Sequence, residues 1–61
     1  MKLIIEEEAD FIVEQIGWGR YVWQGIGDFQ FLQSAIEFTS PFAAATHAQR
    51  ALASRVYCEI S

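Results

Sequence analysis

The chain has 61 residues, of which 52% are hydrophobic and 15% aromatic, and its net charge is −4. This length allows one domain, residues 1–61, and the apolar content excludes a disordered chain, which combines low hydrophobicity with high net charge. The four basic residues are scattered, whereas direct binding to nucleic acid needs clustered Lys and Arg, so we expect partners with basic surfaces, such as proteins that hold DNA or RNA.

The cysteine count and the N-terminus indicate the compartment. Cys58 is the only cysteine, so no disulfide forms within the chain, whereas small secreted domains usually carry several. We interpret Cys58 as a small core residue. Lys2 and the apolar run 3–5 are followed at once by Glu6, where a signal peptide has a long apolar region. No stretch reaches the ~20 apolar residues of a membrane span, and we expect a cytoplasmic protein.

The half of the chain before Pro41 is predicted to form strands. Residues 3–5 are a short β-branched run that leads into an acidic cluster, and residues 11–16 form a second candidate that ends at Gly17-Trp18-Gly19. A helix over residues 9–16 is the alternative, because its apolar residues share one helical face. Eight residues are few for a helix, which favours the strand.

A β-hairpin is predicted around Gly27-Asp28. The runs 20–26 and 29–32 are rich in β-prone residues, and a Gly-Asp pair between two such runs is typical of a primed two-residue turn. In this register Gln24 lies opposite Phe31. The second run continues to residues 36–38 if a bulge near residues 33–35 absorbs a slip in the alternation.

The predicted hairpin carries large apolar side chains on both faces. Alternation gives one set, Tyr21, Trp23 and Leu32, and an opposite set, Val22, Ile26, Phe29 and Phe31. Because one helix covers one face, either the other face stays partly open or a bulge or the N-terminal segment buries both sets. Open apolar patches on small proteins usually mark contact sites.

After Pro41 the chain is predicted to be helical. Ser40 suits the N-cap, Pro41 suits the first helical position, and the alanine-rich run 42–53 has high helix propensity. A helical wheel predicts an apolar stripe of Phe42, Ala45, Ala48, Leu52 and Val56, interrupted by Gln49, and an opposite face of Thr46, His47, Arg50 and Ser54. Residues 55–60 are either the last turns of this helix or a final strand. The fold class is α+β: a small antiparallel sheet of three to four strands with one C-terminal helix packed on one face.

The sequence offers no catalytic or metal-binding constellation. His47 and Cys58 lie eleven positions apart, about three helical turns, which is too far for a Cys–His couple. One His and one Cys do not make a structural zinc site. The paired glycines at 17 and 19 and at 25 and 27 lack the Lys-Ser/Thr pair of a phosphate-binding loop. We therefore expect no enzyme activity, no metal and no cofactor.

Acidic clustering is the first candidate for partner contact. Five of the eight acids lie within the first fourteen residues: Glu6, Glu7, Glu8, Asp10 and Glu14. They either protect an edge strand from aggregation or form a negative stripe that imitates spaced phosphates. Surplus aromatic residues are the second candidate, because Trp and Tyr are typical interface anchors.

The length of the chain, its acidic Glu6-Glu7-Glu8 cluster, its Gly27-Asp28 hairpin and its Ser40-Pro41 helix start form a recognisable layout. In this layout the chain resembles small acidic proteins of phages and mobile elements, most closely anti-CRISPR inhibitors of type I surveillance complexes. The resemblance implies a stoichiometric inhibitor that acts in a bacterial host. Such an inhibitor binds a Cas subunit or complex and occupies the basic surface meant for target DNA.

The residues that this resemblance implies for partner contact are carboxylates and two tryptophans. The phosphate substitutes are Glu6, Glu7, Glu8, Asp10, Glu14 and Asp28, and the anchors are Trp18 and Trp23. The high apolar content equally suits a hydrophobic groove between subunits. The alternative function is a small homodimeric structural or assembly module whose exposed aromatic sheet face pairs with itself.

Overall fold

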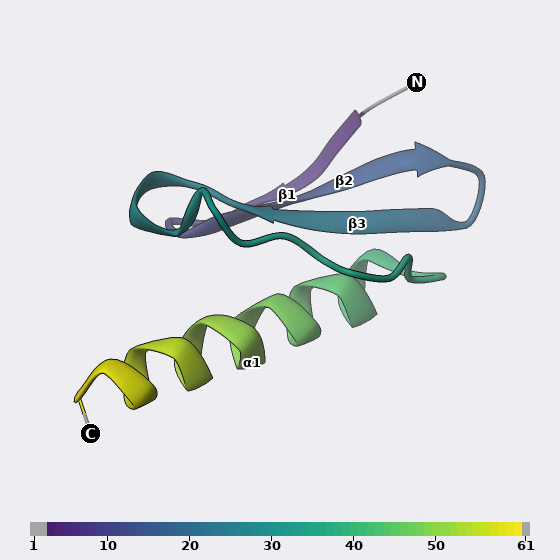
Figure 1. The fold of residues 1–61 in the computed structure, drawn as a ribbon. Coiled ribbons are helices and arrows are strands. Elements are labelled where there is room, and N and C mark those ends of the chain that lie inside the picture. Colours follow the sequence, from purple (N-terminus) through teal and green to yellow (C-terminus); the bar gives the residue numbers. More distant parts are fainter. Residues whose placement is uncertain (1–2, 61) are drawn as a thin grey trace.

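Two layers make up the fold, a three-stranded antiparallel sheet and a helix that crosses one of its faces (Figure 1). The computed structural model describes residues 3–60, with side chains as far as Ser54. The elements are β1 (Leu3–Glu7), β2 (Phe11–Gly17), β3 (Arg20–Gly25), a 3₁₀ turn η1 (Gly27–Phe29) and α1 (Pro41–Ile60), and the strand order is β1-β2-β3. The predicted fold class is confirmed, and residues 55–60 continue the helix. The side chains of Lys2, Val56 and Cys58 lie outside the described residues.

Strand β2 is the centre of the sheet, which confirms the predicted strand over residues 11–16 and not the helical alternative. Phe11 and Val13 are buried and Ile12 and Glu14 are half-buried, as expected of a strand whose side chains alternate between faces. The β1–β2 connection is closed by a 2.9 Å hydrogen bond from the Glu8 N–H to the Phe11 carbonyl. The register between β1 and β2 shifts between Ile4 and Glu6, which marks a bulge in β1.

The tight hairpin of the molecule joins β2 to β3 at Trp18-Gly19. Gly17 pairs with Arg20, and the register shifts by one residue between Gln15 and Gly17. Gly19 has a φ of +65°, in the left-handed region where glycine carries no steric penalty. A single left-handed glycine with an adjacent bulge is a common way to close a short hairpin.

The predicted primed turn at Gly27-Asp28 is wrong. Gly27 has a φ of +62°, but no residue other than glycine has a positive φ in the described chain, so Asp28 does not complete a type I′ turn. A 3₁₀ turn forms there, and Gln24 pairs with Gln33, not with Phe31. The wider turn brings Phe29 against the core, whereas the hairpin register had placed it on the opposite face.

The segment that follows η1 returns along the free edge of β3. It makes bridges at Gln24–Gln33 and Tyr21–Phe38. Between these bridges the Trp23 N–H donates to Ser34 Oγ, and the Ser34 N–H donates to the Trp23 carbonyl. The alternation slips between these two bridges, in the region where a bulge was predicted. Figure 1 shows this segment between β3 and α1, so the β3 edge is covered.

The core lies between the sheet and α1. Its buried side chains are Phe11, Val13, Trp23, Ala44, Ala48 and Leu52. The predicted helical stripe is confirmed at Ala48 and Leu52, which are buried, and at Ala45, which packs against the core. It is wrong at Phe42, which is 80% exposed, and it omits the buried Ala44. Ala44 and Ala48 are one turn apart, and their small side chains let the helix approach the bulky Trp23 and Phe11 closely. Gln49 is exposed, so it does not interrupt the buried stripe.

The helix covers the aromatic face of the sheet. Tyr21 and Trp23 pack toward α1, whereas Val22 alternates to the other side, in register with Glu14 and Ile4. The expected exposed aromatic sheet face is therefore wrong. The face away from α1 carries aliphatic side chains, and no element of the described chain covers it.

Candidate functional site

Five exposed acidic residues lie at one end of the sheet, which we call the acidic end: Glu6, Glu7, Glu8, Asp10 and Asp28. They come from the end of β1, from the turn that leads into β2, and from η1. A 2.9 Å hydrogen bond from the Ile26 N–H to the Asp10 carbonyl holds these two turns together. The contact places η1, and with it Asp28, at the same end of the sheet as acids that precede it by about twenty residues. The fold therefore places two separate acidic segments, residues 6–10 and Asp28, at the same end of the sheet.

The cations with described side chains do not neutralise the acidic end. Arg20 starts β3 at the opposite end of the sheet and forms a bidentate pair with Glu37, with Nη2–Oε2 at 2.7 Å and Nε–Oε1 at 3.0 Å. These hydrogen bonds, helped by the positive charge, lower the pKa of Glu37, and the same pair raises the pKa of Arg20. Arg50 lies on α1, beside a separate hollow that is described below.

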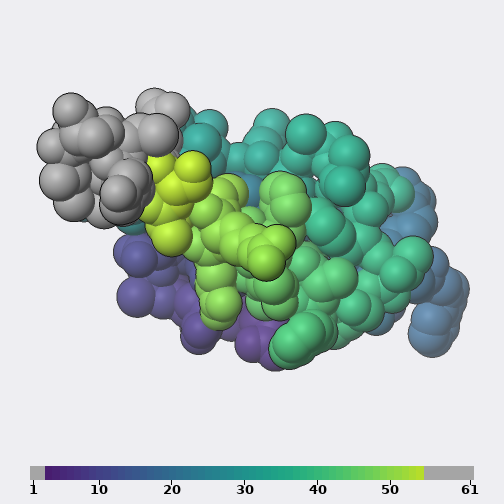
Figure 2. Space-filling model, turned by 90° about the horizontal axis from the view of Figure 1, so that it is seen from below, coloured from purple at the N-terminus to yellow at the C-terminus, as the bar shows by residue number. Residues whose placement is uncertain are grey.

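The other predicted contact residues do not join the acidic end. Glu14 is half-buried in the middle of β2, between Ile4 and Val22 on the face away from α1. Trp18 is 91% exposed at the tip of the β2–β3 hairpin, at the far end of the sheet, where Figure 2 shows the hairpin (blue) projecting. Trp23 is 3% exposed and belongs to the core, so its prediction as a partner anchor is wrong.

The buried Trp23 is held by a residue that had been predicted to face solvent. Its Nε1–H donates to Nδ1 of His47 at 3.1 Å. His47 is exposed on one side, yet its ring centroid lies 5.1 Å from that of Phe38 and 6.1 Å from that of Trp23. Because an indole N–H can only donate, Nδ1 of His47 carries no hydrogen, and the neutral ring carries its hydrogen on Nε2.

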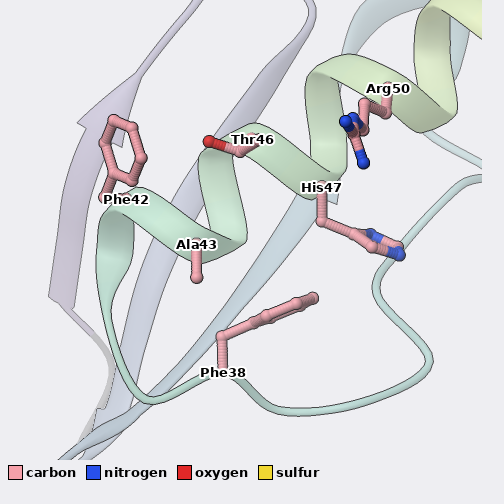
Figure 3. Close-up of a pocket in the computed structure, with 6 residues that line it drawn as sticks. All are labelled: Phe38, Phe42, Ala43, Thr46, His47 and Arg50. Carbon is pink, nitrogen blue, oxygen red and sulfur yellow. The ribbon is translucent and has the colours of Figure 1, made fainter.

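An open hollow of about 360 Å³, which was not predicted from the sequence, lies beside the N-terminal half of α1 (Figure 3). Its lining residues are Phe38, Phe42, Ala43, Thr46, His47 and Arg50. Figure 3 shows Phe38 and His47 turned toward each other, with Phe42 at the start of α1 and Arg50 farther along it. The four-residue spacing of Phe42, Thr46 and Arg50 on one helix face was the available signal.

In the described part of the chain, no three or more His, Cys, Asp or Glu side chains come together in a way that could hold a metal ion. None of its helices combines the length and the apolar character needed to cross a membrane.

By fold and surface, the chain is a small α+β protein with an acidic end on its sheet and a separate aromatic hollow beside its helix. Comparison with protein-family models, with curated proteins and with solved structures finds no match. Its function is therefore argued from its own surfaces.

Proposed function

We propose that this chain is a non-enzymatic binding protein whose acidic end docks on the basic, nucleic-acid-binding surface of a protein partner. The supporting observation is that five exposed acidic residues from two segments of the chain lie at one end of the sheet. Such a surface offers Lys and Arg side chains the closely spaced negative charge that a phosphate backbone offers.

The resemblance to anti-CRISPR proteins suggests the partner. In this proposal the chain acts in the cytoplasm of a bacterial host as a stoichiometric inhibitor of a type I surveillance complex. It occupies a Cas surface that otherwise holds target DNA.

Charge alone does not account for tight binding by the acidic end. Exposed ion pairs contribute about 0.2–1 kcal/mol each, so five give about 1–5 kcal/mol, whereas a micromolar complex needs about 8 kcal/mol. Apolar contacts must supply the rest. Phe31 is 59% exposed and follows η1 at the same end of the sheet, so it is placed to contribute. The carboxylates then set orientation and association rate.

Competition with DNA tests the proposal. A purified type I surveillance complex is mixed with labelled target duplex, and fluorescence anisotropy reports how much duplex the chain displaces. We expect displacement at about 50 mM salt and much weaker displacement at about 200 mM salt. The variant with Glu6→Gln, Glu7→Gln and Glu8→Gln should need at least a tenfold higher concentration for the same displacement.

The matched control is Glu37→Gln, which removes one carboxylate outside the acidic end and should leave displacement unchanged. If displacement of the duplex changes neither with salt concentration nor with the triple substitution, docking by the acidic end is contradicted.

A homodimeric module is a second candidate, favoured by the free edge of β1. This strand pairs only with β2 in the described chain, and Ile4 is 59% exposed between the exposed Leu3 and Ile5. In antiparallel pairing of two β1 strands, Glu6 and Glu7 of each copy lie beside apolar residues of the other, which keeps like charges apart. Light scattering over a concentration series tests it: Ile4→Lys should abolish dimers, and a monomer at all concentrations removes this candidate.

A further inference from the structure

The hollow beside α1 combines open space with apolar walls. Ala43 leaves the space on the helix, and Phe38 and Phe42 line the hollow from two segments, with the Phe42 ring turned away from Phe38 (Figure 3). Phe42 is 80% exposed although it begins a helix whose other face is well packed. A volume of about 360 Å³ lies in the range of small-ligand sites and is large enough to hold an aromatic side chain. The walls therefore favour an apolar group of that size.

The far side of the hollow offers hydrogen-bond donors without an acceptor to match them. Arg50 forms no ion pair with any residue whose side chain is described. In the neutral ring of His47, Nε2 carries the hydrogen, because Nδ1 accepts from Trp23. A guanidinium binds a carboxylate in a bidentate manner, and one guanidinium balances one negative charge. On a chain with a net charge of −4, a single Arg favours a monoanion over a doubly charged phosphate.

The spacing along α1 relates these two halves of the hollow. Ala43 and Arg50 lie seven residues apart on the same helix face, which is about 10.5 Å along the axis. A long helical side chain leans toward the N-terminus, so the guanidinium extends about one turn back from Arg50, toward Ala43. About 5 Å then separates the cation from the apolar space above Ala43. An aromatic ring and a carboxylate on the same amino acid residue are separated by a comparable distance.

We propose that this hollow binds the C-terminal residue of a partner polypeptide, with an aromatic side chain above Ala43 between Phe38 and Phe42 and the terminal carboxylate on Arg50. The hollow is open, so neighbouring residues of a polypeptide can extend from it along the surface of α1. The site lies beside the N-terminal half of α1 and uses none of the carboxylates of the acidic end. Binding at this site is therefore independent of the proposed function and can be tested separately from it.

Amide chemical shifts of the ¹⁵N-labelled chain report binding of three probes: N-acetyl-Gly-Gly-Phe with a free carboxylate, the same peptide as its C-terminal amide, and N-acetyl-phenylalanine. We expect shifts around residues 42–50 and a dissociation constant in the millimolar range for the free-acid peptide. The amide should bind at least fivefold more weakly. In Arg50→Gln the acid and the amide should bind equally weakly.

Two further variants complete the test. Ala43→Leu fills the hollow and should abolish binding while leaving the Arg50 side chain in place. Arg20→Gln removes the same charge outside the hollow and should leave binding unchanged.

Equal affinity for the acid and the amide peptide overturns the proposal, as do shifts confined to other parts of the chain. Equal affinity for N-acetyl-phenylalanine and the free-acid peptide overturns the polypeptide as occupant, since the peptide residues then add nothing. Arg50 and Ala43 lie outside the buried core, and the comparison of acid with amide requires no variant at all.

Discussion

Gly25 is the position where the fold tolerates no side chain, and its substitution by alanine tests how the acidic end is assembled. It ends β3 just before η1. A Cβ at this position would lie 2.0 Å from the carbonyl oxygen of Phe29 and 2.8 Å from its carbonyl carbon. The first distance is a full ångström inside the 3.0 Å limit that Cβ atoms observe. Because the obstacle is backbone, no side-chain rotation relieves the clash.

The cost of Gly25→Ala follows from what has to move. The turn must shift by about 1 Å, which is overpacking of the kind that costs about 1–3 kcal/mol. The shift also strains two 2.9 Å hydrogen bonds, from Gly25 N–H to the Leu32 carbonyl and from Ile26 N–H to the Asp10 carbonyl, each with a net value of about 0.5–1.5 kcal/mol. We expect a loss of about 2–4 kcal/mol. A chain of this length has a total stability of only about 3–9 kcal/mol.

Gly27→Ala is the matched comparison. Nothing lies within 4 Å of a Cβ at Gly27, but its φ of +62° costs an L-residue about 1–2 kcal/mol. Urea unfolding of both variants, followed by far-ultraviolet circular dichroism, measures the free energy of unfolding. This free energy should be lowest for Gly25→Ala, intermediate for Gly27→Ala and highest for the wild type. A Gly25→Ala variant as stable as the wild type, or more stable than Gly27→Ala, refutes the close approach of Phe29 to β3.

Two other substitutions test local interactions. Hydrogen bonds from Arg20 lower the pKa of Glu37 in the folded chain, so its ionised form stabilises the fold above its ordinary value of 4.5, and this contribution is lost as the pH falls through the lowered value. Thermal unfolding over a pH series should show the Tm of the wild type and the Tm of Glu37→Gln converging in acid. A difference in Tm that does not change with pH contradicts the pairing of Arg20 with Glu37. Ser40 Oγ accepts a hydrogen bond from the Ala43 N–H at 3.1 Å. Ser40→Ala should therefore lower the free energy of unfolding by about 1 kcal/mol, which corresponds to about 4–8 °C in Tm. Ser40→Asp keeps an acceptor at this position and should retain the stability of the wild type. Equal losses in both Ser40 variants contradict the cap.

Local signals in the sequence were enough to predict the fold class. The pattern over residues 11–16 favoured a strand over the alternative helix because the segment is short, and β2 confirms the strand. Ser40 and Pro41 satisfy the first turn of a helix by themselves, and α1 begins where they predict. Signals of this kind act within a few residues, so they do not depend on the rest of the fold.

Two features were decided by long-range packing. A Gly-Asp pair is compatible with a primed turn and with a 3₁₀ turn, and the choice depends on whether Phe29 reaches the core. The phase of α1 is ambiguous because alanines occur around much of its circumference. The bulk of Trp23 and Phe11 decides it, since only small residues such as Ala44 and Ala48 fit against them.

The sequence predicted only the part of the candidate site that depends on neighbouring residues, and long-range contacts decide the rest. Glu6, Glu7, Glu8 and Asp10 are neighbours in sequence, so their proximity is expected, whereas Asp28 joins them only through the contact between Ile26 and Asp10. Composition does not distinguish the 91% exposed Trp18 from the 3% exposed Trp23. That difference arises because one is at a hairpin tip and the other faces the helix.

The topology also limits how a partner can use both charge and aromatic anchoring. The β1–β2 turn and the exit from β3 must lie at one end of an antiparallel sheet, and the β2–β3 hairpin must lie at the other. Strand β2 has seven residues, so the acidic end and Trp18 are separated by about 20 Å. A partner that contacts both must present a basic patch and an apolar pocket at that distance. Otherwise the two ends serve different contacts, and a basic surface alone engages only the carboxylates.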